Sequence, residues 1–237
     1  MVYRAIYRSS MFPTNQGSFR LFRVLGIDVW LHWSWLLVAF WVLSSRQDMY
    51  SSLAWNAAEY LSLFAIVLLH EYGHALACRQ VGGSANRIVL WPLGGVAYVS
   101  PPFRPGAQLW SIVAGPLVNV GLVPIFWFAP QLLLLAGVSP DSDDFWRWLF
   151  TVERINFTIL IFNMLPIYPL DGGQTLRSLL WFKIGPVKSL RYASAIGILG
   201  AIGLVGLALW LQSLFGAAMA AFLGVNSWKA FQATRGQ

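Results

Sequence analysis

Long apolar runs separated by short polar stretches dominate this chain of 237 residues. Six runs can be distinguished: 29–44, 53–78, 107–136, 146–165, 192–211 and 214–231. Each approaches the roughly 20 residues that a helix needs to cross the hydrocarbon of a bilayer, so the pattern predicts an all-α polytopic membrane protein with about six transmembrane helices. Little more than Gln212-Ser213 separates the last two runs, which favours a tight helical hairpin over one long broken helix.

The stretch between the second and third runs has a different pattern. Residues 87–100 carry β-branched and aromatic side chains on both sides of Gly94-Gly95, which is typical of a short β-hairpin. The free edge of a strand cannot face lipid, because its N–H and C=O groups would lack partners there. We expect this membrane-associated hairpin to be shielded by protein or to lie at the membrane surface.

The composition supports a membrane location. Hydrophobic residues make up 57% of the chain and charged residues 11%, whereas about 25% of the residues in soluble domains are charged. We expect a single membrane-embedded domain over residues 1–237, with no room for a second, soluble domain. The sole cysteine, Cys78, excludes intrachain disulfides and a cysteine-rich metal site.

The net charge of +7 has a spatial explanation. The basic residues are dispersed at the ends of the apolar runs. They form no basic patch on a known nucleic-acid-binding domain, which argues against nucleic acid as a partner. With the N-terminus inside, thirteen of the sixteen basic residues fall on the cytoplasmic side, as the positive-inside rule expects. Both termini are therefore predicted to be cytoplasmic, in a bacterial or archaeal inner membrane or, alternatively, an organellar membrane.

The N-terminal residues 1–25 are basic and contain no acidic residue. They also lack the long apolar core of a cleavable signal peptide. We interpret them as a basic cytoplasmic flank. An organellar transit peptide and initiation at Met11 are the alternatives.

The candidate chemistry starts with His70-Glu71-Tyr72-Gly73-His74, an H-E-x-x-H motif in the second run. Helical residues four apart lie on one face, so both imidazoles can bind one zinc ion while Glu71 acts on a water molecule beside it. His70 lies about seventeen residues from the start of its run, or roughly 25 Å into the membrane, in its cytoplasmic half. Ionisable residues at this depth are rare without a function.

Catalytic zinc commonly has three protein ligands and one water, so a third ligand is required. Asp171 is the leading candidate, because the fourth run ends on the cytoplasmic side and brings this residue to a similar depth. Pro166 and Pro169 interrupt the helix ahead of it, and Gly172-Gly173 permits a close backbone approach. The alternative ligands are Asp28, Glu153 and His32. The two acids lie nearer the membrane surfaces, and a single histidine is more often structural.

Two asparagines within the apolar runs need polar partners. Asn119 ends the stretch 115–119 (GPLVN), and Asn163 lies eight residues before Asp171. Each can orient a substrate or stabilise an oxyanion. The competing interpretation of 115–119 is a notch of small residues where helices pack closely.

These motifs resemble the site-2 protease family of intramembrane zinc metalloproteases. Besides the H-E-x-x-H motif, the resemblance rests on 26–37 (GIDVWLHWSWLL), 90–97 (LWPLGGVA), 114–119 (AGPLVN) and 163–173 (NMLPIYPLDGG), in the family's order. It implies one zinc ion held by His70, His74 and Asp171, with Glu71 as the general base. It also implies that the enzyme cleaves in or near the transmembrane segment of a membrane-anchored substrate, often to release a transcription factor, sigma factor or anti-sigma factor.

The resemblance has further implications for organisation and partners. Many members carry an inserted PDZ domain or C-terminal CBS domains, and this sequence looks like the compact form without them. A site-1-type protease acting upstream, or a regulatory protein, is an implied partner. Residues 26–175 would form the catalytic core, and the two spans within 190–232, rich in Gly and Ala, would form a gate for lateral entry.

A substrate helix must unwind before its peptide bonds become accessible. The hairpin can hold the unwound segment by strand addition along Val96, Ala97 and Tyr98, or it can be a simple interfacial plug.

Two other functions fit parts of the pattern. A zinc transporter or metal-binding membrane protein without peptidase activity would explain His and Asp in the membrane, but it gives Glu71 no proton-transfer role. An inactive relative acting as a scaffold agrees poorly with the intact ligand set.

Overall fold

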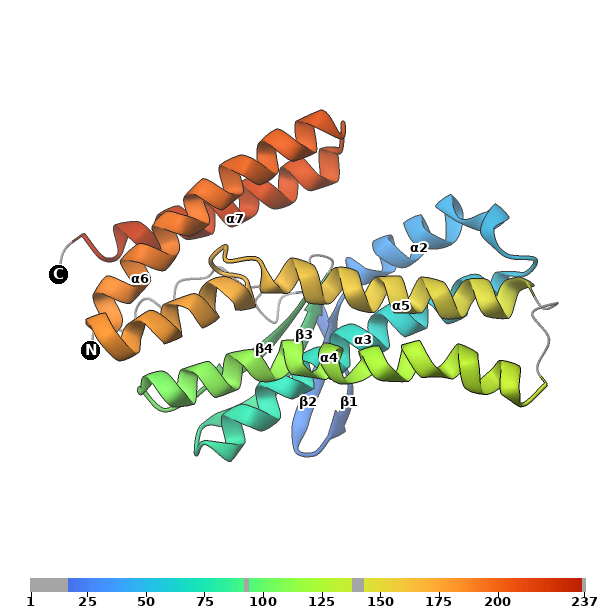
Figure 1. Cartoon of the computed structure of the whole chain (residues 1–237), viewed down its shortest axis with the longest axis horizontal. Coiled ribbons are helices and arrows are strands. Elements are labelled where there is room, and N and C mark those ends of the chain that lie inside the picture. The colour runs from blue at the N-terminus through green and yellow to red at the C-terminus, as the bar shows by residue number, and fades with distance from the viewer. Residues whose placement is uncertain (1–16, 92–93, 138–142, 236–237) are drawn as a thin grey trace.

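A computed structural model describes residues 17–91, 94–137 and 143–235. The described chain is mostly helical, with one small sheet (Figure 1). Its helices are α2 (Trp35–Ser45), α3 (Leu53–Gln80), α4 (Pro105–Leu135), α5 (Asp143–Met164), α6 (Asp171–Trp210) and α7 (Leu214–Gln232), with a 3-10 turn, η1 (Gln47–Met49). The strands are β1 (Ser18–Val24), β2 (Ile27–His32), β3 (Ser84–Trp91) and β4 (Gly94–Ser100).

Among the described residues, α3, α4 and α6 are long and apolar enough to cross a bilayer. This agrees with the prediction of a mostly helical integral membrane protein. The other three predicted spans do not reach the same length and apolar composition. They correspond to α2, which has only 11 residues, and to α5 and α7.

The first predicted span, 29–44, is wrong in its first part, because β2 occupies residues 27–32. Alternate side chains of β2 are buried, namely Ile27, Val29 and Leu31. This period of two is that of a strand, whereas a helix repeats every 3.6 residues. β2 pairs in parallel with β3, with Asp28 opposite Arg87.

The predicted hairpin is confirmed as β3 and β4, which pair antiparallel with Ser84 opposite Ser100. It is half of a four-stranded sheet in the order β1-β2-β3-β4, so the prediction of an all-α fold with one hairpin understated the sheet. β1 comes from the end of the predicted N-terminal flank; residues 1–16 of that flank lie outside the described residues.

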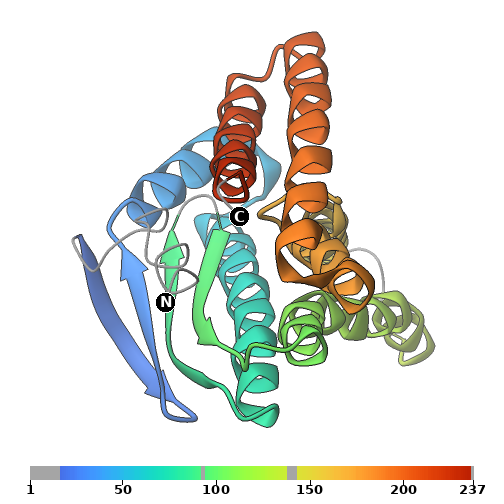
Figure 2. The ribbon, with the colours of Figure 1, turned by 90° about the vertical axis from the view of Figure 1, so that its left-hand side faces the viewer.

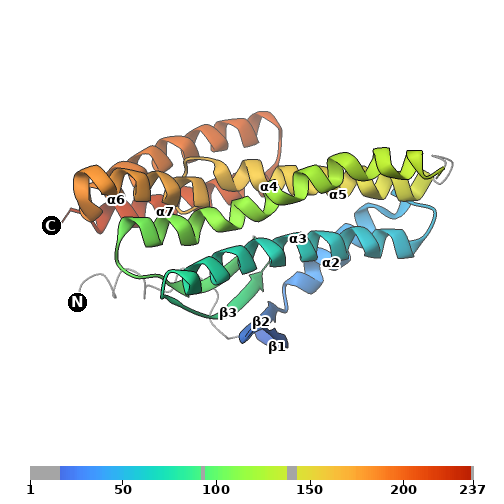
Figure 3. The same ribbon diagram turned by 60° about the horizontal axis from the view of Figure 1, so that its bottom comes forward.

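One face of the sheet packs on α3 and forms the main core of the protein (Figure 2). The buried residues of this core are Ile27, Val29, Leu31, Trp35, Val67, Ala75, Cys78, Ala85, Ile88 and Leu90. On its other sides α3 packs against α4 and α5, which run alongside it (Figure 3). The H-E-x-x-H segment of α3 itself contacts β4 of the sheet and helix α4.

Helix α6 begins at Asp171, well before the predicted run at 192–211. It bends at Gly185, whose φ of +79° is non-helical and which precedes Pro186. Its first part packs near α4, and its second part pairs with α7, so the predicted hairpin of the last two runs is confirmed (Figure 1). Ser213 caps α7 by accepting a hydrogen bond from the Gly216 N–H at 3.0 Å.

Candidate metal centre

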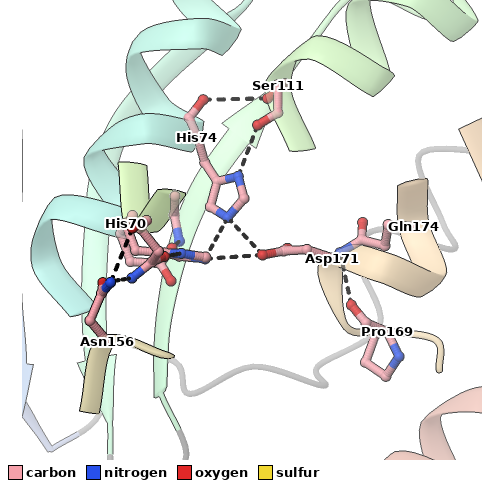
Figure 4. A network of polar contacts seen from close by, with 10 residues as sticks. His70, His74, Ser111, Asn156, Pro169, Asp171 and Gln174 are labelled. Carbon is pink, nitrogen blue, oxygen red and sulfur yellow. Dashed lines mark hydrogen bonds and ion pairs between the residues drawn. The ribbon is translucent and has the colours of Figure 1, made fainter. Parts of the chain in front are cut away.

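Three potential ligand atoms converge between α3 and the start of α6 (Figure 4). The Nε2 atoms of His70 and His74 lie 3.1 Å apart. Asp171 Oδ2 lies 3.0 Å from the Nε2 of His70 and 3.3 Å from that of His74. All three side chains are buried. The structure thus brings together the two histidines and the aspartate that the sequence singled out.

The spacing of these atoms fits a single zinc ion. Zinc–nitrogen and zinc–oxygen bonds of about 2.0–2.2 Å in a tetrahedral site place neighbouring ligand atoms about 3.3 Å apart. The observed separations of 3.0 to 3.3 Å are close to that value. Two imidazole nitrogens and one carboxylate oxygen are also a ligand set that catalytic zinc uses.

The second nitrogen of each imidazole is held by a neighbouring helix. His74 Nδ1 lies 2.9 Å from the backbone carbonyl oxygen of Ser111 in α4, which can only accept, so this nitrogen carries the proton. His70 Nδ1 lies 2.6 Å from Asn119 Oδ1, also in α4. When Nδ1 donates, Nε2 keeps a free lone pair for a metal.

Glu71 lies beside this cluster and is held by the sheet. Its ligand atom lies within 4.8 Å of those of His70 and His74. Its Oε2 accepts a hydrogen bond of 2.7 Å from the N–H of Ala97 in β4. The carboxylate therefore lies close to the two histidine ligand atoms but is turned toward β4, where it can reach a water molecule next to a bound metal.

Two glycines leave room for this arrangement. A Cβ atom at Gly95 would collide with the side chain of Glu71, and one at Gly115 would collide with the imidazole of His74. Gly95 was predicted to lie in a hairpin turn. In the structure it belongs to β4, and the absence of a side chain allows Glu71 to approach the strand.

Asp171 reaches the site because α5 ends at Met164 and α6 begins seven residues later. A carboxylate in the first turn of a helix is favoured by the helix dipole. The Nε2 of Gln174 donates to the backbone oxygen of Pro169 at 2.8 Å and holds the connecting turn (Figure 4). The predicted close backbone approach at Gly172-Gly173 is confirmed, since a Cβ there would collide with backbone atoms of this connection.

The other candidate residues lie outside this cluster. Asp28 pairs with Arg20 at 2.8 Å, and His32 contacts Ser34. Glu153 is half-buried in α5, and among the described residues it joins no group that could hold a metal. Asn163 is also half-buried and, within the same described ranges, makes no hydrogen bond to the cluster.

One residue of the network was missed by the sequence analysis. Asn156, in α5, is fully buried. The Nδ2 of Asn119 donates to Asn156 Oδ1 at 2.8 Å, and the Nδ2 of Asn156 donates to the backbone oxygen of Asn119 at 3.0 Å. The only sequence signal was an asparagine on an apolar helix, seven residues before Asn163.

Comparisons with known proteins agree with this geometry. Residues 138–205 match peptidase family M50. A zinc metalloprotease of Methanocaldococcus jannaschii is 34% identical over 182 residues, which cover 76% of this chain and 50% of the relative. Rip3 of Mycobacterium tuberculosis is 32% identical over 232 residues, which cover 90% of this chain and 56% of the relative. The chain spans about half the length of these relatives.

A solved structure is similar over almost its whole length. The site-2 protease from Methanocaldococcus jannaschii superimposes with a TM-score of 0.62 and 26% sequence identity. The alignment covers 90% of this chain and 95% of the solved one. The sequence matches and this structural match lead to the same assignment. The chain belongs to the site-2 protease family, peptidase family M50.

Proposed function

We propose that the protein is an intramembrane zinc metalloprotease that cleaves a membrane-anchored protein in or near its transmembrane segment. The observation that carries this proposal is the convergence of His70, His74 and Asp171 on one point, with Glu71 beside it. The names of relatives as zinc metalloproteases support it. The presence of α3 among the helices that can cross a bilayer supports a site within the membrane.

In this proposal His70, His74 and Asp171 hold one zinc ion. When bound, zinc polarises a peptide carbonyl and makes a water molecule more acidic. Glu71 is close enough to accept the proton of that water and later to deliver it to the leaving amine nitrogen. Burial of the site keeps bulk water away from these groups. Because hydrolysis consumes water, a polar path must lead water from the cytoplasmic side to the site.

We further propose that the substrate binds as a strand along Val96, Ala97 and Tyr98. β4 is at one end of the sheet order. The N–H of Ala97 points to Glu71 rather than to β3, so it lies on the free edge. A strand that adds to this edge would compete with Glu71 for that N–H. Substrate arrival would then release the carboxylate next to the peptide bond to be cleaved.

The arrangement of the chain in the membrane is a further part of the proposal. The charge distribution supports six spans with both termini in the cytoplasm of a bacterial or archaeal cell. The paired helices in residues 190–232 would form the lateral gate to a core at 26–175.

Two further proposals concern the substrate and a partner. Asn163 would contact the substrate near the active site. An upstream protease that shortens the substrate is an expected partner.

The decisive test replaces Glu71→Gln in the purified full chain and in cells. We expect one zinc ion per chain to remain bound, because Glu71 is not one of the three converging ligands. Membrane proteomes of cells with the wild-type and the variant protein should differ by membrane-anchored proteins that accumulate uncut in the variant. A His74→Ala variant serves as the comparison, since it should lose both zinc and cleavage.

Two results would contradict the proposal. The first is equal cleavage of an identified substrate by the wild-type and Glu71→Gln proteins. The second is zinc flux across proteoliposomes that does not depend on Glu71, which would support a transporter instead.

A further inference from the structure

The amide pair Asn119–Asn156 links the candidate zinc ligand His70 to a third helix. His70 is on α3, Asn119 on α4 and Asn156 on α5. Both asparagines are completely buried. Their three hydrogen bonds measure 2.6, 2.8 and 3.0 Å.

The chemistry of one backbone carbonyl fixes the orientation of both amides. The backbone oxygen of Asn119 can only accept, so Asn156 must present its NH₂ group there. Its Oδ1 then faces Asn119, and Asn119 must present its own NH₂ group to it. Asn119 Oδ1 is thereby left facing His70.

This orientation has a consequence for the metal ligand. An oxygen facing Nδ1 of His70 requires the proton on Nδ1 and leaves the lone pair on Nε2. A reversed amide would present NH₂ to Nδ1, and the proton would move to Nε2. In that tautomer His70 could not bind zinc through Nε2.

We propose that Asn156 is a positioning residue that keeps the Asn119 amide in the orientation required for zinc binding by His70. It touches neither His70 nor the converging ligand atoms, and it acts through Asn119. The inference rests on the proposed function in one respect, because it takes His70 as a zinc ligand.

The experiment measures the zinc affinity of the purified full chain in detergent by competition with a chelator. Asn156→Leu keeps the branching at Cγ but makes neither hydrogen bond, and we expect it to weaken zinc binding by about 10- to 100-fold, as for other partners of metal ligands. Asn156→Asp can make both hydrogen bonds when its buried carboxyl is protonated, because the O–H then donates to the backbone oxygen of Asn119 and the other oxygen accepts from its NH₂ group. This variant should therefore restore most of the affinity. Thr151→Val is the control, because Thr151 is a buried polar residue of the same helix.

A double substitution separates positioning from simple packing. Asn119→Asp carries two oxygens, either of which accepts from His70 Nδ1, so no orientation has to be kept. In this background Asn156→Leu should cause little further loss of zinc affinity, whereas lost packing would persist. If Asn156→Leu does not fold, Asn156→Ser, which is too short to hold the amide, replaces it.

The zinc affinities of these variants decide whether the positioning role of Asn156 stands. It is overturned if Asn156→Leu binds zinc as tightly as the wild type, if Thr151→Val loses as much, or if the loss is unchanged in the Asn119→Asp background. If the wild-type chain itself binds no zinc, the proposed function fails instead. Binding by the wild type with no effect at position 156 would leave the proposed function intact and remove only this inference.

Discussion

At the scale of residues, the site depends on the space beside its side chains as well as on their chemistry. His74 fits against α4 only because Gly115 has no Cβ. Glu71 approaches β4 only because Gly95 has none. Neither glycine can contribute a ligand or a proton, yet each determines where a reactive group can lie.

Gly115→Ala tests this requirement. The added methyl group would collide with the imidazole of His74 and move its Nε2 away from Asp171. We expect zinc affinity to fall by roughly tenfold or more, as for other changes around metal ligands, while α4 itself remains helical. Chelator competition measures the effect.

Gly121→Ala is the matched control for Gly115→Ala. It lies on the same helix, and an added Cβ would meet no atom within 4 Å. Its zinc affinity should equal that of the wild type. Equal affinities for the two alanine variants would show that His74 does not need the space at Gly115.

At the scale of elements, the bend in α6 separates two roles of one helix. The first part carries Asp171 to the site, and the second part pairs with α7. The bend is at Gly185, where φ is +79°, a region that residues with a Cβ rarely adopt. Pro186 follows and cannot donate a hydrogen bond to the preceding turn.

Gly185→Ala should therefore destabilise the protein by about 1 kcal/mol, because alanine is strained at this φ. Gly203→Ala is the comparison. It lies in the second part of α6, where a Cβ also meets no atom within 4 Å and the backbone is helical. We expect it to be neutral or stabilising. Unfolding of both variants by SDS in mild detergent measures the difference, and equal stabilities would contradict the role of φ at the bend.

The same scale shows how far the sequence could predict the structure. The convergence of His70, His74 and Asp171 was predictable. The helical spacing of the two histidines, and the position of each residue along its apolar run, follow from counting residues. The strand at 27–32 was not, since only His32 and Ser34 interrupt the apolar residues between it and α2, so the strand resembles the start of a span. Asn156 was not predictable either, because a single buried asparagine does not reveal its partner on another helix.

At the scale of the whole molecule, α3 sets the relation between the site and the membrane. Its 28 residues give a length of about 42 Å, which exceeds the roughly 30 Å of hydrocarbon. Its two ends should therefore emerge on opposite sides of the membrane. Ser52 precedes the helix at one end, and Ser100 lies near Gly83 just beyond the other. Both serines are exposed.

Cysteine labelling at these two positions tests the proposed orientation. In a Cys78→Ala background, which removes the only native cysteine, Ser52→Cys should react with a membrane-impermeant maleimide added outside intact cells. Ser100→Cys should react only after the membrane is permeabilised, because the positive-inside rule places its end of α3 in the cytoplasm. The Cys78→Ala chain alone should stay unlabelled, and both single cysteines should react in detergent. Labelling of both from one side would mean that α3 does not cross the membrane. The reverse pattern would mean that Glu71 and its neighbours lie nearer the opposite membrane face, so that water reaches them from outside the cell.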